Sequence, residues 1–293
     1  MFKNLKIIKL KNRALLKIKG EDSKEFLQAL VTNNINFISN EKSIYSALLS
    51  PQGKYLYDFF IFQDSKSNYL IIDCEKNSYQ ELMQKLNIYK LRSNVEINLQ
   101  DRIDVYTVYG SDLIKFISNL KMTYQEGYTK NISDNLFFID PRNKSLGLRV
   151  YSNNLSNEFK EIASGILSDW HYLRIKNKIP HPYIDLEKEK SFIIENNFEK
   201  INAIDFNKGC YIGQENTARQ KYRGTAKRKL VTAEIIGKDV TNGQKIVFDN
   251  RAVGTIRSSS KDICLVSIRS EVYDKCKKNN IKIKINESEL KFL

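Results

Sequence analysis

The C-terminal part of the chain has a pattern of short strands and turns that restricts the folds open to it. From Lys227 onward, short alternating apolar segments recur, and residues typical of tight turns separate them. Gly237 and the pairs Asn242-Gly243 and Asn279-Asn280 supply such turns, because glycine and asparagine tolerate left-handed backbone conformations. This pattern predicts a small all-β barrel or sandwich at residues 229–293, with a boundary near residue 228.

The preceding residues, 1–228, mix strand and helix patterns. Leu5 to Ile18 alternates as strands, and apolar residues at helical spacing follow Asp22. Gly110-Ser111-Asp112 repeats the same succession of strand, glycine, polar residue and helix. Because 293 residues are many for a single core, we predict an α+β region of two interwoven subdomains in residues 1–228, divided near residue 100.

The chain is strongly basic. It has 48 Lys and Arg residues against 34 Asp and Glu, which gives a formal net charge of +14. Such a surface attracts polyanions, including nucleic acid, anionic lipid and polyglutamylated cofactors. The alternative is diffuse solubilising charge, because lysine is abundant along the whole chain. The charge alone leaves both interpretations open.

Cysteine and histidine usage argues against a resident metal. The four cysteines form no CxxC pair and have no regular spacing, and only two histidines accompany them. This pattern predicts neither a Cys/His zinc site nor a self-contained iron–sulfur site, and it fits free thiols in a reducing compartment. No apolar run approaches the roughly 20 residues that span a bilayer, and the N-terminus lacks a signal-peptide core. We therefore expect a cytoplasmic protein without a membrane partner.

Residues 208–219 form the most chemically varied stretch, and two interpretations compete for it. In the structural interpretation, Gly209 and Gly213 permit a tight turn. Glu215 and Arg219 then form a helical ion pair of about 0.2–0.5 kcal/mol.

In the functional interpretation, Cys210 lies near a helix N-terminus and two residues from Lys208. Both features favour the thiolate, which is the form that attacks electrophiles and ligates metals. Gln214 and Glu215 would present an amide and a carboxylate to a heterocycle that carries N–H donors.

The stretch from Lys208 to Glu215, followed by Ala218-Arg219, resembles the hallmark of the YgfZ-type folate-binding proteins. These are relatives of the glycine-cleavage aminomethyltransferase (T-protein) and include mitochondrial iron–sulfur assembly factors of the same type. Further matches occur in order along the chain. They are Phe26 to Gln28, Leu30 to Asn34, Tyr45 to Lys54 with Asp58, Arg174 with Pro180, Glu195 with Asn197, Phe198 and Glu199, and Val253 to Ser259.

The chain departs from the family pattern at three positions. Asn34 stands where aspartate is common, Ile194 where histidine or proline is frequent, and Glu199 where aspartate is usual. These departures affect individual ligand contacts near those positions. Cys210 occupies the place where the true aminomethyltransferases usually carry aspartate, which favours the YgfZ-type branch.

The resemblance implies a T-protein-like arrangement of three subdomains around a central channel, namely two α+β subdomains and a C-terminal β-barrel. It also implies a bound tetrahydrofolate or derivative and a role in the assembly or maintenance of iron–sulfur proteins. Through these proteins it would indirectly support radical enzymes that modify tRNA. The implied partners are the iron–sulfur assembly machinery or client iron–sulfur proteins.

The resemblance also assigns candidate site residues. Cys210 is the functional thiol, with Lys208 beside it in the motif. The candidate cofactor-binding residues are Asp58, Glu195, Tyr45, Gln214, Glu215 and Arg219. Asp58 and Glu195 would contact the pterin, and Tyr45 would stack on a ring. Strand alternation alone favours a solvent-facing Asp58, whereas the resemblance favours a pocket-facing one.

Two other functions compete with this interpretation. One is catalysis proper, a tetrahydrofolate-dependent one-carbon transfer like that of the T-protein, so whether the protein is an enzyme stays open. The other is direct RNA binding driven by the positive charge.

Overall fold

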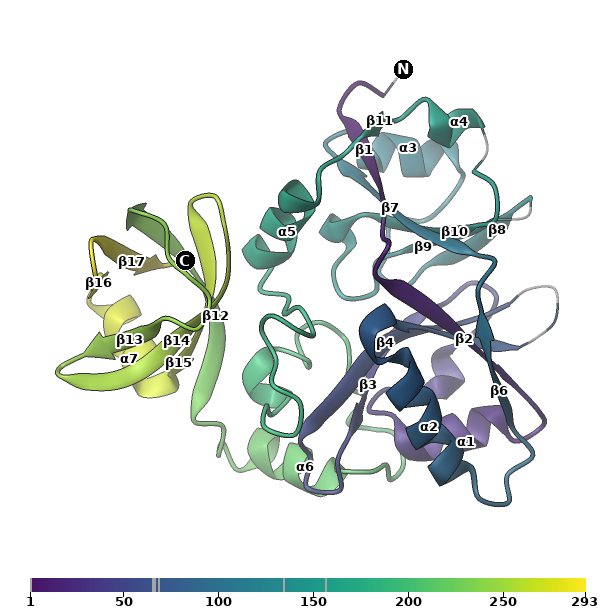
Figure 1. Ribbon diagram of the computed structural model, residues 1–293, viewed down its shortest axis with the longest axis horizontal. Coiled ribbons are helices and arrows are strands. Elements are labelled where there is room, and N and C mark those ends of the chain that lie inside the picture. The colour runs from purple at the N-terminus through teal and green to yellow at the C-terminus, as the bar shows by residue number, and fades with distance from the viewer. Residues whose placement is uncertain (1, 65–66, 68, 134, 156) are drawn as a thin grey trace. The chain divides into compact units, whose positions relative to one another are not determined.

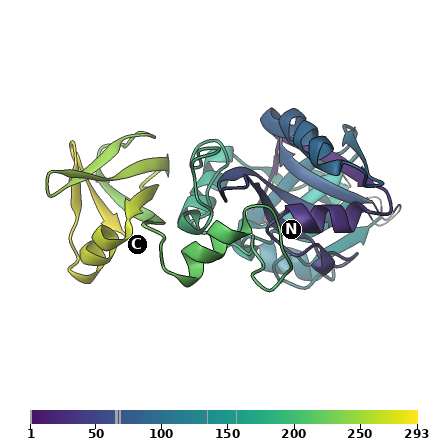
Figure 2. The same ribbon diagram turned by 90° about the horizontal axis from the view of Figure 1, so that it is seen from below.

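The computed structural model describes residues 2–64, 67, 69–133, 135–155 and 157–293 (Figures 1 and 2). The chain forms two compact units. The first contains Met1–Leu49, Leu56–Ile166 and Lys200–Ile212, and the second contains Ser50–Tyr55, Leu167–Glu199 and Gly213–Leu293. None of the helices in the described residues is long and apolar enough to cross a membrane.

The first unit is built on two mainly antiparallel sheets. One sheet has the order β3-β4-β5-β2-β6 and the other has the order β11-β1-β7-β10-β9-β8. The strands of the first sheet are β2 (Arg13–Lys19), β3 (Ile44–Leu49), β4 (Tyr55–Gln63), β5 (Leu70–Glu75) and β6 (Glu96–Gln100). Those of the second are β1 (Leu5–Lys9), β7 (Asp104–Gly110), β8 (Thr129–Ile132), β9 (Asn135–Ile139), β10 (Leu148–Ser152) and β11 (Ala163–Ser164).

Helices cover one face of each sheet. Their bounds are α1 (Ser23–Leu30), η1 (Ile35–Phe37), η2 (Lys76–Ser78), α2 (Tyr79–Lys90), α3 (Leu113–Asn119), η3 (Lys144–Leu146) and α4 (Asn157–Lys160). Leu27 of α1 and Leu82 of α2 are buried in one core with Leu16 and Ile61 of the first sheet. Phe116 of α3 belongs to the separate core of the second sheet.

The chain crosses twice between the two sheets. It passes from β1 to β2 at residues 9–13 and returns from β6 to β7 at residues 100–104. The two crossings lie side by side, because the Leu10 N–H donates to the Val105 carbonyl at 2.8 Å. As a result, the N-terminal strand β1 pairs with β7, with Lys6 opposite Tyr109.

The repeated glycine–aspartate sequences form two corners of the same geometry. Gly20 has φ +114° and Gly110 has φ +132°, and a Cβ on either would lie 1.9 Å from a carbonyl oxygen, that of Asn94 or Asn4 respectively. The Asn94 N–H donates to Asp22 at 2.6 Å, and the Asn4 N–H donates to Asp112 at 3.0 Å. Glycine is therefore required at each corner by both conformation and space.

The second unit contains the C-terminal barrel. Its six strands have the order β13-β14-β15-β12-β17-β16, and β13 also contacts β16, which nearly closes the sheet. The strands are β12 (Arg228–Gly237), β13 (Lys245–Phe248), β14 (Arg251–Ser260), β15 (Ile263–Arg269), β16 (Ile283–Ile285) and β17 (Ser288–Phe292). The remaining elements of the unit are α5 (Leu167–Lys176), η4 (Ile194–Asn196), α6 (Gln214–Tyr222) and α7 (Ser270–Lys278).

Two helices of this unit pack against the barrel. Val272 and Cys276 of α7 are buried in the barrel core. Ile175 of α5 packs with Leu230 and Leu265 of the barrel in a separate apolar cluster. The structure thus confirms the predicted α+β class with a small C-terminal barrel, and it contains three sheets.

Candidate functional site

A buried tyrosine–carboxylate pair lies at the centre of the first unit. Tyr45 comes from β3 and Asp58 from β4, and the Tyr45 hydroxyl donates to the Asp58 carboxylate. Tyr45 is 2% exposed and Asp58 is 5% exposed. The expectation from strand alternation, a solvent-facing Asp58, is therefore wrong. Both faces of β4 are covered, one by the helix-bearing core and the other by the second sheet, so alternation along this strand does not distinguish inside from outside.

Aromatic rings and a guanidinium surround this pair. The Phe60 ring lies 4.9 Å from the Tyr45 ring, and the Arg142 guanidinium lies 5.2 Å from the Tyr45 ring centre. Arg142 is held by Asp140, with Nε to Oδ1 at 3.0 Å and Nη2 to Oδ2 at 2.8 Å. Burial and the charge of Asp58 raise the pKa of Tyr45 well above its usual value, although Arg142 opposes them. Tyr45 is therefore a neutral phenol that donates to the carboxylate.

A buried charge network, which the sequence did not predict, lies beside this cluster. Asp73 of β5 is fully buried and accepts from Arg13 Nε at 2.7 Å, Arg149 Nη2 at 2.7 Å and the Tyr151 hydroxyl at 2.6 Å. Because Arg149 and Tyr151 lie on β10, the network joins the two sheets. The sequence signal that could have indicated this network is the presence of charged residues inside the apolar strand sequences Leu70–Glu75 and Leu148–Ser152.

Phe60 connects the network with the Tyr45–Asp58 pair. The guanidinium groups of Arg149, Arg142 and Arg13 lie 4.0, 4.8 and 5.7 Å from the centre of its ring. A cation over an aromatic face is attracted by the ring quadrupole, and more strongly when both are shielded from water. The residues around Asp58 are thus held in place by surrounding charge and ring contacts.

Lys208, predicted beside the functional thiol, has a set of backbone partners. Its Nζ donates to the carbonyls of Gln28 at 2.7 Å, Val31 at 2.5 Å and Asn33 at 2.9 Å. These carbonyls lie at the C-terminal end of α1, where such groups lack helical partners and a positive charge is favourable. Burial lowers the pKa of Lys208 to about 8, against a smaller opposing effect of Asp205. This arrangement ties the motif segment to α1.

Replacing Lys208 with methionine is expected to lower the free energy of unfolding of the first unit by about 2–3 kcal/mol. The change preserves most of the side-chain volume but leaves three buried carbonyls without their donor. Leaving a buried polar group without its hydrogen-bond partner costs about 1–3 kcal/mol. Urea unfolding followed by circular dichroism measures the loss. Lys24→Met, on the exposed face of α1, is the matched control and should change stability by less than about 0.5 kcal/mol. Equal stabilities of the two variants would contradict this role for Lys208.

Cys210 differs from the other cysteines in accessibility. The chain's four cysteines are all described and free; Cys210 is exposed, whereas Cys74, Cys264 and Cys276 are buried. Burial raises the pKa of both Cys74 and Cys264 to about 12. Because attack and metal ligation require the thiolate, Cys210 is the thiol best placed to react with another molecule. Within the described part of the chain, no group of three or more His, Cys, Asp or Glu residues is arranged to hold a metal ion.

The remaining predicted site residues lie in the second unit. Gln214, Glu215 and Arg219 are on α6, which begins directly after Gly213 with φ +81°. Glu215 and Arg219 form the expected ion pair at 2.7 Å, with their side chains 85% and 48% exposed. Such a pair contributes little to stability. In η4, Glu195 accepts the N–H groups of Lys227 and Arg228, at 2.9 and 3.2 Å.

The structure therefore brings together some of the predicted residues. It pairs Tyr45 with Asp58 in the first unit and Glu215 with Arg219 in the second. Lys208 and Cys210 lie on one segment of the first unit.

Comparison with known structures identifies the fold. The structure matches the crystal structure of the glycine cleavage system aminomethyltransferase T from Bartonella henselae with a TM-score of 0.77. The match covers 99% of this chain and 85% of that one, at 10% sequence identity. The chain thus has the aminomethyltransferase fold, on which it carries an exposed motif thiol and a buried tyrosine–carboxylate pair.

Sequence comparison identifies relatives of the chain. No protein-family model matches the chain. The chain is 29% identical over 234 residues to the mitochondrial iron–sulfur cluster assembly factor IBA57 homologue of Neurospora crassa, covering 77% of this chain and 52% of that protein. It is 26% identical over 275 residues to the Dictyostelium discoideum homologue, covering 80% and 64%. It is 25% identical over 307 residues to mouse IBA57, covering 96% and 81%.

In sequence the chain is similar to the IBA57 iron–sulfur cluster assembly factors, and in fold it is similar to the glycine-cleavage aminomethyltransferase. This result confirms the resemblance inferred from the motif at residues 208–219. The chain spans about half of the Neurospora crassa relative and under two thirds of the Dictyostelium one.

Proposed function

We propose that this protein is an accessory factor in the assembly or maintenance of iron–sulfur proteins and that it binds tetrahydrofolate or a derivative. The observation that carries the proposal is the exposed Cys210 in the family motif of a chain whose relatives are iron–sulfur cluster assembly factors. A thiol is a ligand and nucleophile suited to iron and sulfur chemistry.

The proposed folate site is centred on Asp58 and Tyr45. A buried carboxylate accepts the paired N–H groups of a pterin, and aromatic rings cover its flat faces. The Tyr45 hydroxyl orients the carboxylate, and the rings of Tyr45 and Phe60 lie next to it. Glu195, Gln214, Glu215 and Arg219, all in the second unit, remain proposed folate-binding residues.

The proposed partners are the iron–sulfur assembly machinery or client iron–sulfur proteins, including radical enzymes that modify tRNA. A cytoplasmic location fits this role, because free thiols such as Cys210 persist in a reducing compartment.

Deleting the gene and restoring it tests the iron–sulfur role. Loss of the protein should lower the activities of iron–sulfur enzymes in cell extracts, and the wild-type gene should restore them. Enzymes that lack iron–sulfur clusters serve as the control. Unchanged iron–sulfur enzyme activities in the deletion strain would overturn the proposed function.

Replacing Asp58 with alanine is expected to weaken tetrahydrofolate binding by roughly 10- to 100-fold. The change removes a charged acceptor from a buried position, where a charge-assisted hydrogen bond is worth about 1.5–3 kcal/mol. Anaerobic calorimetric titration of the purified protein measures the dissociation constants. Glu21→Ala removes an exposed carboxylate from the same unit and should bind like wild type. Equal affinities of Asp58→Ala and wild type would remove Asp58 from the proposed site.

The aminomethyltransferase fold favours one-carbon transfer as the second candidate function. This function predicts formation of methylenetetrahydrofolate from an aminomethyl donor in the presence of the purified protein. Binding of tetrahydrofolate without this product favours the accessory role.

A further inference from the structure

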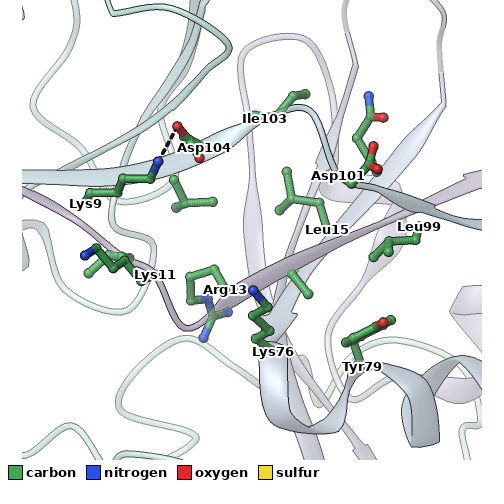
Figure 3. A pocket seen from close by; sticks show the side chains of 14 residues that line it. Lys9, Lys11, Arg13, Leu15, Lys76, Tyr79, Leu99, Asp101, Ile103 and Asp104 are labelled. Atoms are coloured by element: carbon green, nitrogen blue, oxygen red, sulfur yellow. Dashed lines mark hydrogen bonds and ion pairs between the residues drawn. The ribbon is translucent and has the colours of Figure 1, made fainter.

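A pocket in the first unit lies where the chain crosses between the two sheets (Figure 3). It has a volume of about 470 Å³, within the range of about 300–1,000 Å³ typical of small-molecule sites. Three segments line it: the β1–β2 crossing, the start of η2 and α2, and the β6–β7 crossing. Neither Tyr45 nor Asp58 is among its lining residues, so it is separate from the proposed folate site.

The pocket combines an apolar surface with a basic edge. Ala14, Leu15 and Val105 are buried, whereas Leu99 is 43% exposed at the opening. Figure 3 shows Lys11, Arg13 and Lys76 on one side of the pocket and Leu99 and Asp101 on the other.

The three lysines that line the pocket differ in whether they form an ion pair. Lys9 forms an ion pair with Asp104 at 2.6 Å, which neutralises both groups. Lys11 and Lys76 are exposed, and neither has a side-chain partner within the described ranges of the chain. Two exposed lysines from different segments therefore line this pocket, which favours an anion over a neutral or cationic ligand.

Arg13 adds buried donors to the same edge. Its side chain is 9% exposed. Three of its N–H groups bind the Asp73 carboxylate, the Asp73 carbonyl and the Glu75 carboxylate. A guanidinium has five N–H donors, and the other two have no hydrogen-bond partner in the residues that the structure describes. The two acidic partners fix the guanidinium plane and offset its charge, so the net positive charge of this edge comes from Lys11 and Lys76.

We infer that this pocket binds a small organic anion, a carboxylate or a phosphate ester with an apolar body. The anionic group binds at Lys11 and Lys76, and the apolar body covers Leu15 and Leu99. Asp101 lies on the far side from the basic edge and excludes a second anionic group there by like-charge repulsion.

Titration of the full chain with three probes tests this inference. Benzoate and phenyl phosphate carry the two anionic groups on similar apolar bodies, and benzyl alcohol is the uncharged equivalent. Protein NMR at low salt reports dissociation constants and the backbone amides that respond. At least one anion is expected to bind roughly tenfold more tightly than benzyl alcohol and to shift amides at residues 9–15, 76–79 and 99–105. The stronger of the two anions identifies the ligand's acidic group.

Charge-removal variants locate the contacts. The double variant Lys11→Gln, Lys76→Gln is expected to weaken anion binding about tenfold and to leave benzyl alcohol unaffected. The matched control is Lys278→Gln, Lys284→Gln, which removes two exposed lysines of the second unit and should bind like wild type. Leu99→Ala should weaken the binding of both anions about threefold. Asp58→Ala should bind the probes normally, so failure of the proposed folate site leaves this test intact.

Three outcomes would overturn the inference. They are tight binding of benzyl alcohol equal to that of the anions, unchanged anion affinity in the Lys11→Gln, Lys76→Gln variant, and the absence of amide shifts at the pocket with all three probes.

Discussion

Replacing Asp73 with alanine is expected to lower the free energy of unfolding of the first unit by about 3–5 kcal/mol. This is the typical cost of removing one partner from a buried ion pair, because the remaining charge stays buried without compensation. Here the change would leave Arg13 and Arg149 without their shared carboxylate and the Tyr151 hydroxyl without its acceptor. Few single substitutions elsewhere in the chain should have a larger effect on stability.

Hydrogen exchange measures this effect locally. Exchange should accelerate on β2, β5 and β10, which carry the residues of the network. The barrel strands of the second unit should exchange as in wild type. Asp104→Ala is the matched control. It removes a carboxylate that pairs with Lys9 at 2.6 Å, with both side chains more than 40% exposed, so it should cost less than about 1 kcal/mol. Similar losses in the two variants would contradict a dominant role for the buried network.

The same network makes the first unit sensitive to acid. Burial raises the pKa of Asp73, but the charges of Arg13 and Arg149 outweigh it and hold the pKa below its usual value. A carboxyl whose pKa is lower in the folded state stabilises the fold above its unfolded pKa of about 3.9. This contribution is lost as the pH falls through the folded pKa. Asp73→Ala should therefore flatten the acid limb of the unfolding profile.

The sequence predicts the parts of this fold that depend on local patterns. The barrel follows from turn residues such as Gly237 and Gly243, both of which have positive φ. The corners at Gly20 and Gly110 follow from the repeated strand–glycine–aspartate succession, because local geometry alone requires glycine there. The motif at residues 208–219 likewise predicts the family, since a run of specific residues needs no knowledge of distant contacts.

The sequence does not predict which buried polar groups meet. Asp73 and Arg149 are 76 residues apart and lie on different sheets, so no local pattern relates them. Lys208 has partners 175 to 180 residues earlier in the chain. The alternation in β4 fails for Asp58 for the same reason, because the second sheet that covers it comes from later residues. Non-local packing thus decides which of these buried polar groups meet.

The strongest functional effect is expected from replacing Cys210 with alanine. In a deletion strain, the variant should leave iron–sulfur enzyme activities at the level of the empty vector. The physical reason is that the thiolate is the soft ligand and nucleophile of the motif, and the other cysteines are buried and cannot replace it. Cys210→Ser tests the same point, because it preserves the size of the side chain and its hydrogen-bonding capacity while removing the sulfur.

Two controls separate chemistry from folding in this experiment. Because Cys210 is exposed, its replacement should change stability by less than about 0.5 kcal/mol, which thermal unfolding of the purified variant measures. Asn207→Ala alters an exposed residue of the same segment and should restore the enzymes fully. If Cys210→Ala restores them as well, the thiol has no part in the function, and the motif's role reduces to the structural anchoring that Lys208 provides. If only Cys210→Ala and Cys210→Ser fail while both proteins remain folded, the function requires the sulfur atom itself.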